Sequence, residues 1–458
     1  MTQHRFHPSI LREYDIRGVV GETLGVDDAR AVGRAFGTVV GGAGKRVAVG
    51  YDGRHSSPDL EAALVEGLIA AGCTVLRIGL GPTPMLYYAA HALETDGGVM
   101  ITGSHNPPDY NGIKMVHAGK PVYGDQIQDL GRIAAAGTYV DGQGSSQDTP
   151  VFDAYLDRLA GDYRGGAMNV AWDPGNGAAG DVVSALVKRL PGRHVIINGD
   201  IDGRFPNHHP DPTVEANLAQ LKQVVTDEGL DMGLAFDGDG DRVGAIDAQA
   251  RLVWADELLA ILARDVIKEI PGATIIADVK TSKIAFDEIA RAGGTPMMWK
   301  SGHSLVKAKM AEVNSPLSGE MSGHIFFKHR FYGVDDGIYA GLRIMESVSA
   351  QGGSLAALKD AIPKAYNTPE VRFECPEERK VEVVDAIAKR LAEEGATVSD
   401  IDGVRVSTSD GWWLMRASNT QPALTARVEG ETPEGLDRLR AQVRGHLEAV
   451  GLEPPADL

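Results

Sequence analysis

Three short apolar runs, each ending in an aspartate, constrain the fold of this chain more than any other feature. They are Val47–Asp52, Val170–Asp173 and Ile275–Asp278. Each run is typical of a buried strand that meets a polar turn. The first three-quarters of the chain is therefore predicted to use one structural plan three times.

Helices and further strands follow each of these runs. After the first run, Ser57 is expected to cap a helix that starts at Pro58 and ends at Gly72. Strands that alternate with helices predict α/β layers. The expected second strands are Thr74–Gly79, Val195–Asn198 and Met297–Trp299, and the expected third strands are Gly98–Thr102, Met232–Asp237 and Ser315–Glu320.

The last quarter of the chain departs from this plan. Near residues 363–369 the pattern changes to a helix, a strand pair that turns at 409–411, one more strand and a final helix. The polar stretch 141–150 has the composition of a linker. We expect an α/β fold of three similar α/β domains around a cleft plus a smaller C-terminal α+β domain, with bounds 1–150, 151–251, 252–365 and 366–458.

Charge and cysteine content narrow the class of protein. The formal net charge is −18, which argues against nucleic acid or an anionic membrane as a partner. Two cysteines, Cys73 and Cys375, are too few for a disulfide framework, and Cys73 is expected to be buried. No apolar run could span a membrane, and the N-terminal segment lacks the apolar region of a signal peptide. These features predict a cytoplasmic protein. Because the sequence shows no exposed apolar seam, we also expect a monomer.

The loop after the first unit's third strand could carry a nucleophile. It reads Thr102-Gly103-Ser104-His105-Asn106-Pro107, and Lys114 follows ten residues after Ser104. A serine between a glycine and a histidine can approach a ligand closely, although the same residues also favour a plain turn.

The corresponding loop of the second unit is typical of a cation site. Asp237, Asp239 and Asp241 alternate with glycines, and oxygen ligands favour magnesium or calcium. The EF-hand is excluded because its sixth and twelfth positions would be Arg242 and Ala248. A solvated acidic turn is the alternative. Arg242 would direct a positive charge toward a phosphate beside the ion.

Two more loops and several cations complete the expected site. Glu320, Ser322 and His324 can bind sugar hydroxyls, and the stretch 416–420 suits a phosphate or an ordinary strand-end turn. In an acidic protein, a phosphate site must be a local cluster of basic residues. Candidates near strand ends are Arg17, Arg54, Lys280 and His303.

The four motifs TGSHNP, DGDGDR, GEMSGH and RASNT occur in this order, one in each expected domain. With the segment Tyr14–Gly18, they make the whole chain resemble the α-D-phosphohexomutases, most closely their bacterial bifunctional phosphomannomutase/phosphoglucomutase branch. The resemblance implies four domains around a central cleft and a phosphoserine at Ser104. It also implies Mg²⁺ bound by Asp237, Asp239, Asp241 and a phosphoserine oxygen, with glucose 1,6-bisphosphate as activator and intermediate.

The resemblance assigns further roles in substrate binding. Glu320 and Ser322 would bind the sugar, while Arg416, Ser418, Asn419 and Thr420 would hold the phosphate that is not reacting. Gln421 departs from relatives that carry threonine, which could change contacts of this phosphate site. Other positions that the family uses in its cleft are Tyr14, Arg17, His105, Lys114, Arg242, Lys280, His303 and His324.

The expected activity is the reversible conversion of hexose 1-phosphates and hexose 6-phosphates, for glucose and mannose. Arg17 and Arg242 are expected to act in catalysis with Ser104, and His105, Lys114 and His324 are candidates for proton transfer. The alternatives are a phosphoglucosamine mutase, a phosphatase that uses the same serine, and a sugar-phosphate-binding or cation-sensing module without a reaction.

Overall fold

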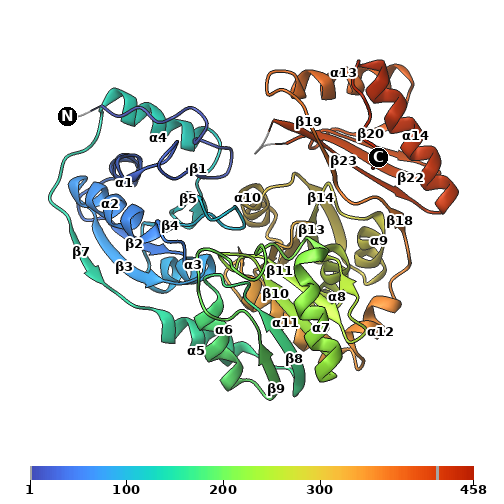
Figure 1. Cartoon of the computed structure of the whole chain (residues 1–458), viewed down its shortest axis with the longest axis horizontal. Helices are drawn as coiled ribbons and strands as arrows, with labels where there is room; N and C mark the ends of the chain where they lie inside the picture. Colours follow the sequence, from blue (N-terminus) through green and yellow to red (C-terminus); the bar gives the residue numbers. More distant parts are fainter. Residues whose placement is uncertain (1–2, 419–421) are drawn as a thin grey trace.

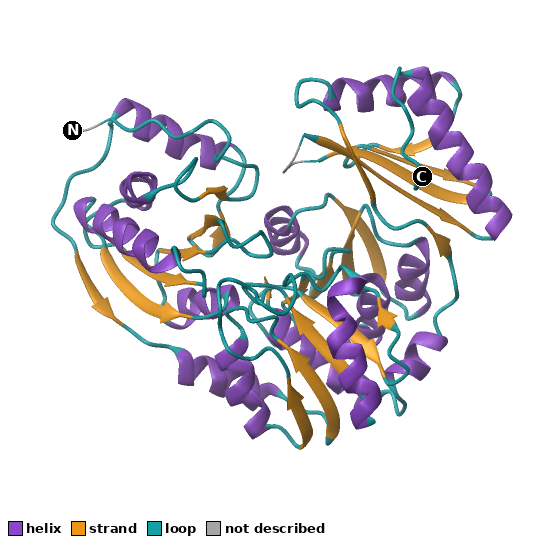
Figure 2. Cartoon of the chain, viewed as in Figure 1, coloured by secondary structure: helices purple, strands orange, loops and turns teal. Residues whose placement is uncertain are grey.

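The computed structural model describes residues 3–418 and 422–458. Within these residues, four sheets follow one another along the chain. Figure 1 shows them in an arc from the N-terminal part, in blue, to the C-terminal part, in red, and Figure 2 shows helices beside each sheet. The expected fold class, three similar α/β domains and a smaller C-terminal domain, is confirmed.

The first sheet has the strand order β1-β5-β4-β2-β3-β7, with β6 paired to β5. Strands β2, β3, β4 and β7 are parallel, and β5 is antiparallel to β4 and β1. The strands are β1 (Ile16–Val19), β2 (Arg46–Tyr51), β3 (Thr74–Leu80), β4 (Gly97–Ile101), β5 (Tyr110–His117), β6 (Lys120–Pro121) and β7 (Ser145–Asp148). The helices are α1 (Val26–Val40), α2 (Ser57–Ala70), α3 (Thr83–Ala92) and α4 (Asp125–Ala136).

The second sheet has the order β12-β11-β10-β8-β9. Its strands are β8 (Met168–Asp173), β9 (Gly192–Ile196), β10 (Met232–Phe236), β11 (Val243–Asp247) and β12 (Leu252–Val253). Its helices are α5 (Phe152–Asp162), α6 (Gly180–Leu186) and α7 (Ala219–Glu228), with short 3₁₀ turns at Val187–Arg189 and Glu215–Leu218. Strand β12 lies just past residue 251 and still pairs with β11.

The third sheet has the order β14-β13-β15-β16-β17. Its strands are β13 (Thr274–Asp278), β14 (Thr295–Trp299), β15 (Leu317–Gly319), β16 (Ile325–Phe327) and β17 (Val334–Asp335). Its helices are α8 (Ala255–Glu269), α9 (Lys283–Arg291), α10 (His303–Val313), α11 (Gly337–Ala350) and α12 (Leu355–Asp360).

The fourth sheet has the order β18-β23-β22-β21-β20, with β19 paired to β23, and is antiparallel. Its strands are β18 (Tyr366–Asn367), β19 (Val371–Glu374), β20 (Thr397–Ser399), β21 (Val404–Thr408), β22 (Gly411–Ala417) and β23 (Ala423–Gly430). Its helices are α13 (Lys380–Glu393) and α14 (Pro433–Ala449).

The first three sheets repeat one four-stranded motif. The orders β3-β2-β4-β5, β9-β8-β10-β11 and β14-β13-β15-β16 are equivalent, and in each the last strand is antiparallel to its neighbour. The sequence predicted the first three strands of each unit but not this fourth strand. A short polar loop joins the third strand to the antiparallel fourth strand in each unit, so these loops lie at the same edge of each sheet.

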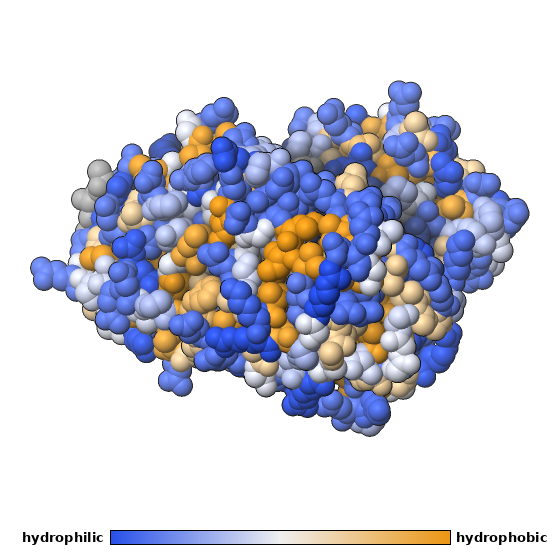
Figure 3. Space-filling view, turned by 60° about the horizontal axis from the view of Figure 1, so that its bottom comes forward, coloured by the Kyte–Doolittle hydropathy of each residue, from blue (hydrophilic) through white to orange (hydrophobic). Residues whose placement is uncertain are grey.

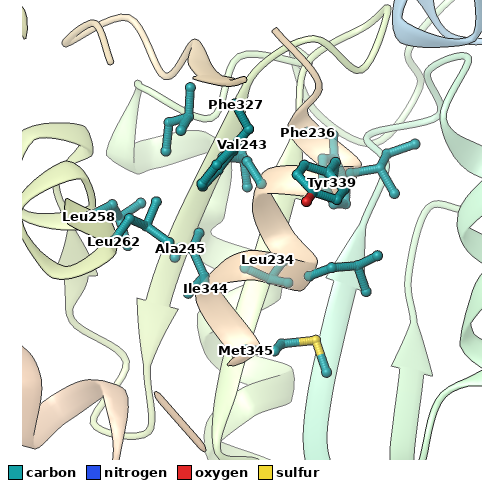
Figure 4. Packing of buried hydrophobic residues seen from close by; sticks show 14 of the residues in the cluster. Leu234, Phe236, Val243, Ala245, Leu258, Leu262, Phe327, Tyr339, Ile344 and Met345 are labelled. Atoms are coloured by element: carbon teal, nitrogen blue, oxygen red, sulfur yellow. The ribbon is translucent and has the colours of Figure 1, made fainter. Parts of the chain in front are cut away.

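A shared core fixes the second domain against the third. Helix α11 follows the third sheet, yet its Tyr339, Ile344 and Met345 pack with Leu234 and Phe236 of β10, as Figure 4 shows. All of these side chains are at most 1% exposed. Because close-packed cores resist displacement, the loops at the edges of these two sheets are held in a fixed relation.

Backbone carbonyls of the third domain hold the fourth domain in place. The buried Arg405 donates to the carbonyl of Val279 (2.8 Å), and its guanidinium stacks on the Trp412 ring at 3.7 Å. Arg427 donates to the carbonyl of Lys280 at 2.5 Å. The turn after β13 therefore forms part of the interface with the C-terminal domain.

Two local expectations were wrong. Ser57 does not cap α2, since the helix begins at Ser57 and its hydroxyl donates instead to Asp52 Oδ1 at 2.5 Å. The expected linker 141–150 contains strand β7, which pairs with β3. All four side chains of β7 are exposed, so its sequence carries no apolar alternation, and the strand forms only because the edge of β3 offers backbone partners.

The surface and the cysteines complete the description. Both cysteines are buried and free, as expected for Cys73. Among the described residues, no helix is long and apolar enough to cross a membrane. Figure 3 shows one face on which hydrophilic side chains surround an apolar patch. The oligomeric state stays a prediction.

The buried cap of α11 predicts a pH dependence of stability. Asp336 Oδ1 accepts from the Tyr339 backbone N–H, Tyr155 donates to Oδ2 at 2.8 Å, and burial raises the pKa of Asp336 to about 7. An acid with a raised pKa binds an additional proton in the folded chain, so the free energy of unfolding falls as the pH rises from about 4 to 7. Asp336→Asn removes this titration and keeps an N-capping side chain.

We expect the free energy of unfolding of Asp336→Asn to vary less between about pH 5 and 8 than that of the wild type, by at least about 1.4 kcal/mol, the value of one pKa unit. Denaturant unfolding at several pH values measures this difference. Asp153→Asn, a change at an exposed aspartate in the first turn of α5, should follow the wild-type curve. An equal pH dependence for Asp336→Asn and the wild type would contradict the raised pKa.

Candidate active site

Three loops that follow the third strand of each repeated unit lie against one another. Thr83 N donates to the carbonyl of Asp239 (2.8 Å), which joins the start of α3 to the acidic loop. A Cβ added to Gly238 would lie 2.4 Å from the Ser104 carbonyl oxygen, so only glycine allows this approach. An isolated β-bridge joins Arg242 to His324. The expected convergence of the three loops is therefore present in the structure.

Ser104 is held in an unusual backbone conformation. Its φ is +48°, in the left-handed region that non-glycine residues rarely adopt, and the residue is 2% exposed. The hydroxyl donates to Asp237 Oδ2 at 2.9 Å and lies 3.2 Å from His105 Nδ1. Strain of this kind is often found at functional sites, and here it directs the hydroxyl of Ser104 toward the acidic loop.

The three aspartates of the second loop are fully buried and close together. Their ligand oxygens lie within 4.8 Å of one another. Lys114 of β5 donates to Asp239 Oδ2 (2.8 Å) and Asp241 Oδ2 (2.5 Å). Burial alone would lower the pKa of Lys114, but the aspartates outweigh it and raise that pKa, so Lys114 is charged. Burial and the two neighbouring carboxylates raise the pKa of Asp237 well above its usual value.

The acidic loop has the donors that a hard cation requires. Asp239 Oδ1 and Asp241 Oδ1 are buried and have no hydrogen-bond partner among the described residues. An unpaired buried carboxylate oxygen is costly, and a cation would satisfy both atoms. Carboxylate-only donors match Mg²⁺ or Ca²⁺ rather than a softer metal. The residues present therefore fit a hard divalent ion.

A histidine and an arginine lie beside this trio. Arg242 Nε donates to His324 Nε2 at 3.1 Å and lies 3.8 Å from Asp237 Oδ2. Since Nε2 accepts, the proton of a neutral His324 is on Nδ1, which lies 3.1 Å from Asp335 Oδ2. His105 is neutral, because burial and the charges of Arg242 and Arg17 lower its pKa well below the usual value.

The expected sugar-binding residues lie at the junction of three domains. Tyr14 donates to the carbonyl of Ser301 at 2.8 Å, and the Gly302 N–H donates to Glu320 Oε1 at 2.5 Å. Glu320 Oε2 is buried and has no hydrogen-bond partner among the residues described, and burial raises the pKa of Glu320. Ser322 is half-buried in the turn after Glu320. Glu320 therefore keeps one oxygen available for a ligand.

The expected phosphate-binding residues are only partly described. Arg416 lies 3.0 Å from Asp402 Oδ2, and the same oxygen accepts from Ser301 N at 3.1 Å. Lys280 lies 3.3 Å from Glu370 Oε2, and these two side chains connect the third and fourth domains. Ser418 is buried, whereas Asn419, Thr420 and Gln421 lie outside the described residues.

The remaining candidates also lie in or beside these loops. Arg17 donates to Asn106 Oδ1 at 2.5 Å, which ties β1 to the Ser104 loop. The rings of His303 and His324 stack with centroids 5.4 Å apart. The structure thus gathers Tyr14, Arg17, His105, Lys114, Arg242, Lys280, His303 and His324 around the loops.

The sequence analysis missed Thr83 and Asp335. Thr83 donates to Asp239 Oδ2 at 2.5 Å from the start of α3. Asp335 lies 3.6 Å from His303 Nδ1 and accepts from Lys307 at 2.7 Å. The two adjacent aspartates at 335 and 336, just before an apolar helix, could have indicated Asp335. Only one of them can cap the helix, so the other is available for another role.

Comparison with known proteins agrees with this geometry. The chain is 43% identical over 449 residues to a protein named phosphomannomutase/phosphoglucomutase from Pseudomonas aeruginosa, covering 98% of this chain and 97% of the relative. The chain belongs to the phosphoglucomutase/phosphomannomutase family. The family expected from the motifs is thereby confirmed. Models described as its alpha/beta/alpha domains I, II and III and its C-terminal domain match residues 8–140, 153–250, 254–366 and 370–446.

A further relative and two solved structures are also similar to this chain. A phosphoglucomutase from Neisseria gonorrhoeae is 41% identical over 96% of this chain and 97% of its own length. A phosphoglucomutase/phosphomannomutase family protein from Burkholderia thailandensis has a solved structure that matches with a TM-score of 0.91 at 41% identity, covering 99% of each chain. A putative phosphomannomutase from Thermus thermophilus shares the fold at 22% identity, with a TM-score of 0.78 over 98% of this chain and 100% of the other.

The acidic trio predicts a metal-binding phenotype. Asp239→Asn removes one of three charged ligands and leaves Lys114 with a weaker partner, so we expect weaker Mg²⁺ binding. Turnover should fall at least about tenfold, a barrier change of about 1.4 kcal/mol. Magnesium titrations of activity, with calorimetry of the protein alone, measure both effects.

Asp247→Asn is a matched control for this variant. Asp247 is equally buried, but it pairs with Arg251 at the far end of β11. Its change should leave the magnesium dependence as in the wild type. Wild-type magnesium dependence in Asp239→Asn as well would show that the acidic loop is only structural.

Proposed function

We propose that this protein interconverts hexose 1-phosphates and hexose 6-phosphates through a phosphoryl group carried on Ser104, with Mg²⁺ held by Asp237, Asp239 and Asp241. One observation carries the proposal: the strained Ser104 hydroxyl lies 2.9 Å from a carboxylate of a buried trio that has two unsatisfied oxygens. This contact supports the proposal, because phosphoryl transfer depends on a nucleophile positioned beside a cation. When bound, Mg²⁺ supplies positive charge that offsets the charge on the transferred group.

The first half-reaction transfers the phosphoryl group to the sugar. The O6–P bond forms as the bond between Ser104 Oγ and phosphorus breaks, and the O6 proton leaves to a base. The product is a hexose 1,6-bisphosphate, and the Ser104 oxygen is left to take up a proton. Arg242 and Lys114 stabilise the negative charge because both are cations beside the acidic trio that the Ser104 hydroxyl contacts.

The second half-reaction regenerates the phosphoserine. The bisphosphate turns within the site, its O1–P bond breaks and O1 takes up a proton, while Ser104 Oγ gives its proton to a base and bonds to that phosphorus. Hexose 6-phosphate is the product, and added glucose 1,6-bisphosphate would restore a dephosphorylated enzyme as its activator. The neutral His105 suits a proton transfer better than the charged Lys114 does, because its Nδ1 lies 3.2 Å from the Ser104 hydroxyl. His324 is a second candidate.

The non-reacting phosphate is assigned to the C-terminal domain. Arg416, Ser418, Asn419 and Thr420 would bind it, together with Lys280 from the third domain. Arginine offers two parallel donors to a phosphate. The buried Arg416 Nε has no hydrogen-bond partner among the described residues, which supports this assignment.

Each domain is assigned one function. Residues 1–150 carry the phosphoserine, 151–251 bind the metal, 252–365 bind the sugar and 366–458 bind the non-reacting phosphate. Relatives of this chain are named phosphomannomutase/phosphoglucomutase, phosphoglucomutase and phosphomannomutase, which supports hexose phosphates as the substrates.

A Ser104→Ala variant tests the nucleophile. We expect turnover to fall at least about a thousandfold, because no group remains to carry the phosphoryl, while the melting temperature and Mg²⁺ binding stay near the wild type. Steady-state kinetics and intact-mass analysis of both proteins measure the effect. The wild type should gain one phosphoryl after incubation with glucose 1,6-bisphosphate, and the gain should map to Ser104.

Ser56→Ala is a matched control, because Ser56 lies in the same domain, beside α2, and Asn111 donates to its hydroxyl. Its turnover should stay within about threefold of the wild type. If Ser104→Ala turned over at nearly the wild-type rate, the phosphoserine mechanism would be wrong. Release of free phosphate in place of hexose 6-phosphate would instead indicate a phosphatase.

The sugar loop predicts dual specificity for glucose and mannose. Glu320 and Ser322 are assigned to the ring oxygens O3 and O4, where glucose and mannose are identical, and a site that does not bind O2 cannot reject either epimer strongly. We expect kcat/KM values within about tenfold for the two 1-phosphates and a much lower value for galactose 1-phosphate. A preference above about a hundredfold for one epimer would show that O2 is bound, and a preference for glucosamine 1-phosphate would indicate the amino-sugar branch.

A further inference from the structure

Arg54 is buried against the backbone of the Ser104 loop. It follows β2 in the turn before α2 and is 2% exposed. Its Nη2 donates to the carbonyl oxygens of Ser104 (2.8 Å) and Asn106 (2.6 Å). Its Nη1 donates to those of Pro107 (2.5 Å) and Tyr110 (2.9 Å). One guanidinium therefore binds three carbonyls of the loop between β4 and β5, here called the Ser104 loop, and the carbonyl of the first residue of β5.

Asp52 completes this support from the end of β2. Its Oδ2 lies 3.3 Å from Arg54 Nε and accepts from the Gly103 N–H at 3.1 Å. The charge of Arg54 is thus balanced by a carboxylate that also binds the Ser104 loop. The pair holds the loop through both an N–H and the carbonyls, and neither side chain contacts the Ser104 hydroxyl in the structure.

The residues around Arg54 leave little space for its guanidinium to move. A Cβ on Gly103 would lie 2.5 Å from Arg54 Cζ, so the loop packs directly on the guanidinium face. On the other side, the Phe205 ring of the second domain lies 5.1 Å from Arg54 Cζ, and a Cβ on Gly203 would lie 2.7 Å from Arg54 Cα. Arg54 is therefore enclosed between the Ser104 loop and the second domain.

We propose that Arg54 is a positioning residue for the phosphoryl transfer, which holds Ser104 in its left-handed conformation with the hydroxyl directed toward the acidic loop. The inference rests on the proposed role of Ser104. Without this side chain, the carbonyls of Ser104, Asn106, Pro107 and Tyr110 lose this donor, and the Ser104 φ of +48° loses its support. A small displacement of a nucleophile lowers the rate of reaction more than it lowers substrate affinity.

The chemistry of arginine is needed for this role. A guanidinium presents five N–H donors in one plane, whereas a lysine ammonium is a single point of charge. Arg54→Lys keeps the charge opposite Asp52 but cannot bind four carbonyls together. The variant therefore separates the geometry of the support from its charge.

The experiment begins with the wild type, in which the phosphoryl group gained from glucose 1,6-bisphosphate is mapped by peptide mass. If it lies on a residue other than Ser104, the proposed function fails, and the inference about Arg54 fails with it. If it lies on Ser104, the rates of Ser104 phosphorylation and of steady-state turnover are then compared between the wild type, Arg54→Lys and Arg54→Met.

We expect kcat to fall at least about thirtyfold in both variants, with the KM for hexose 1-phosphate and the Mg²⁺ dependence within about threefold of the wild type. Single-turnover phosphorylation of Ser104 should slow by the same factor. A purely structural role would lower the melting temperature and the folded fraction, but not kcat per folded molecule at a temperature well below melting.

Arg343→Lys is the matched control. Arg343 is also buried, donates to the carbonyl of His329, pairs with Glu346 and stacks on Phe327, far from the Ser104 loop. The Arg343→Lys variant should be less stable than the wild type but should keep the wild-type kcat per folded molecule. A kcat for Arg54→Lys within threefold of the wild type would overturn the inference and leave the proposed function intact. An equal loss of kcat in Arg343→Lys would overturn it as well.

Asp52→Asn keeps the inference testable if both Arg54 variants fail to fold. Asparagine keeps an acceptor for the Gly103 N–H and removes the charge that holds Arg54. We expect an intermediate loss of kcat, about three- to tenfold, again with little change in KM. An unchanged kcat in this variant would count against the support of the loop by this pair.

Discussion

The structure depends on the burial of three carboxylates at one point. Asp237, Asp239 and Asp241 are fully buried with their oxygens within 4.8 Å of one another, and such a cluster needs positive charge to exist. Lys114 supplies part of it from the first domain, and Arg242 supplies more from the end of the same loop. The ion pairs between Lys114 of the first domain and the aspartates of the second thereby hold the first domain, with Ser104, against the second.

The repeated four-stranded motif explains how separate domains can satisfy this demand. In each unit the polar loop is the connection between the third and fourth strands. Three copies of the motif therefore place three polar loops at equivalent positions. The shared core around α11 then fixes the second loop against the third. The fourth domain is attached more simply, through Arg405 and Arg427 on the carbonyls of Val279 and Lys280, which connects its position to the turn that carries Lys280.

Burial also separates the protonation states of neighbouring groups. Lys114 stays charged because the aspartates outweigh the cost of its burial, whereas burial leaves His105 neutral. Ser104 contacts a neutral imidazole and one carboxylate of the trio that Lys114 partly neutralises, so different groups can stabilise charge and move protons there. The neutral state of His105 comes from its environment, since an isolated histidine with a pKa of about 6.5 is partly protonated near neutral pH.

The sequence by itself determined the order of elements, the four motif loops and the chemical types of their side chains. Periodicity and turn residues are local properties, so the strands before Asp52, Asp173 and Asp278 could be predicted. The sequence could not reveal β7, which has no apolar alternation, nor the roles of Thr83 and Asp335, which lie outside the motifs. Only the tertiary structure decided that Ser57 binds Asp52, that Lys114 lies between two aspartates and that Arg54 binds the carbonyls of the Ser104 loop and of the start of β5. These contacts join residues from about five to more than a hundred positions apart, and their geometry follows from the packing of whole sheets, which no local pattern encodes.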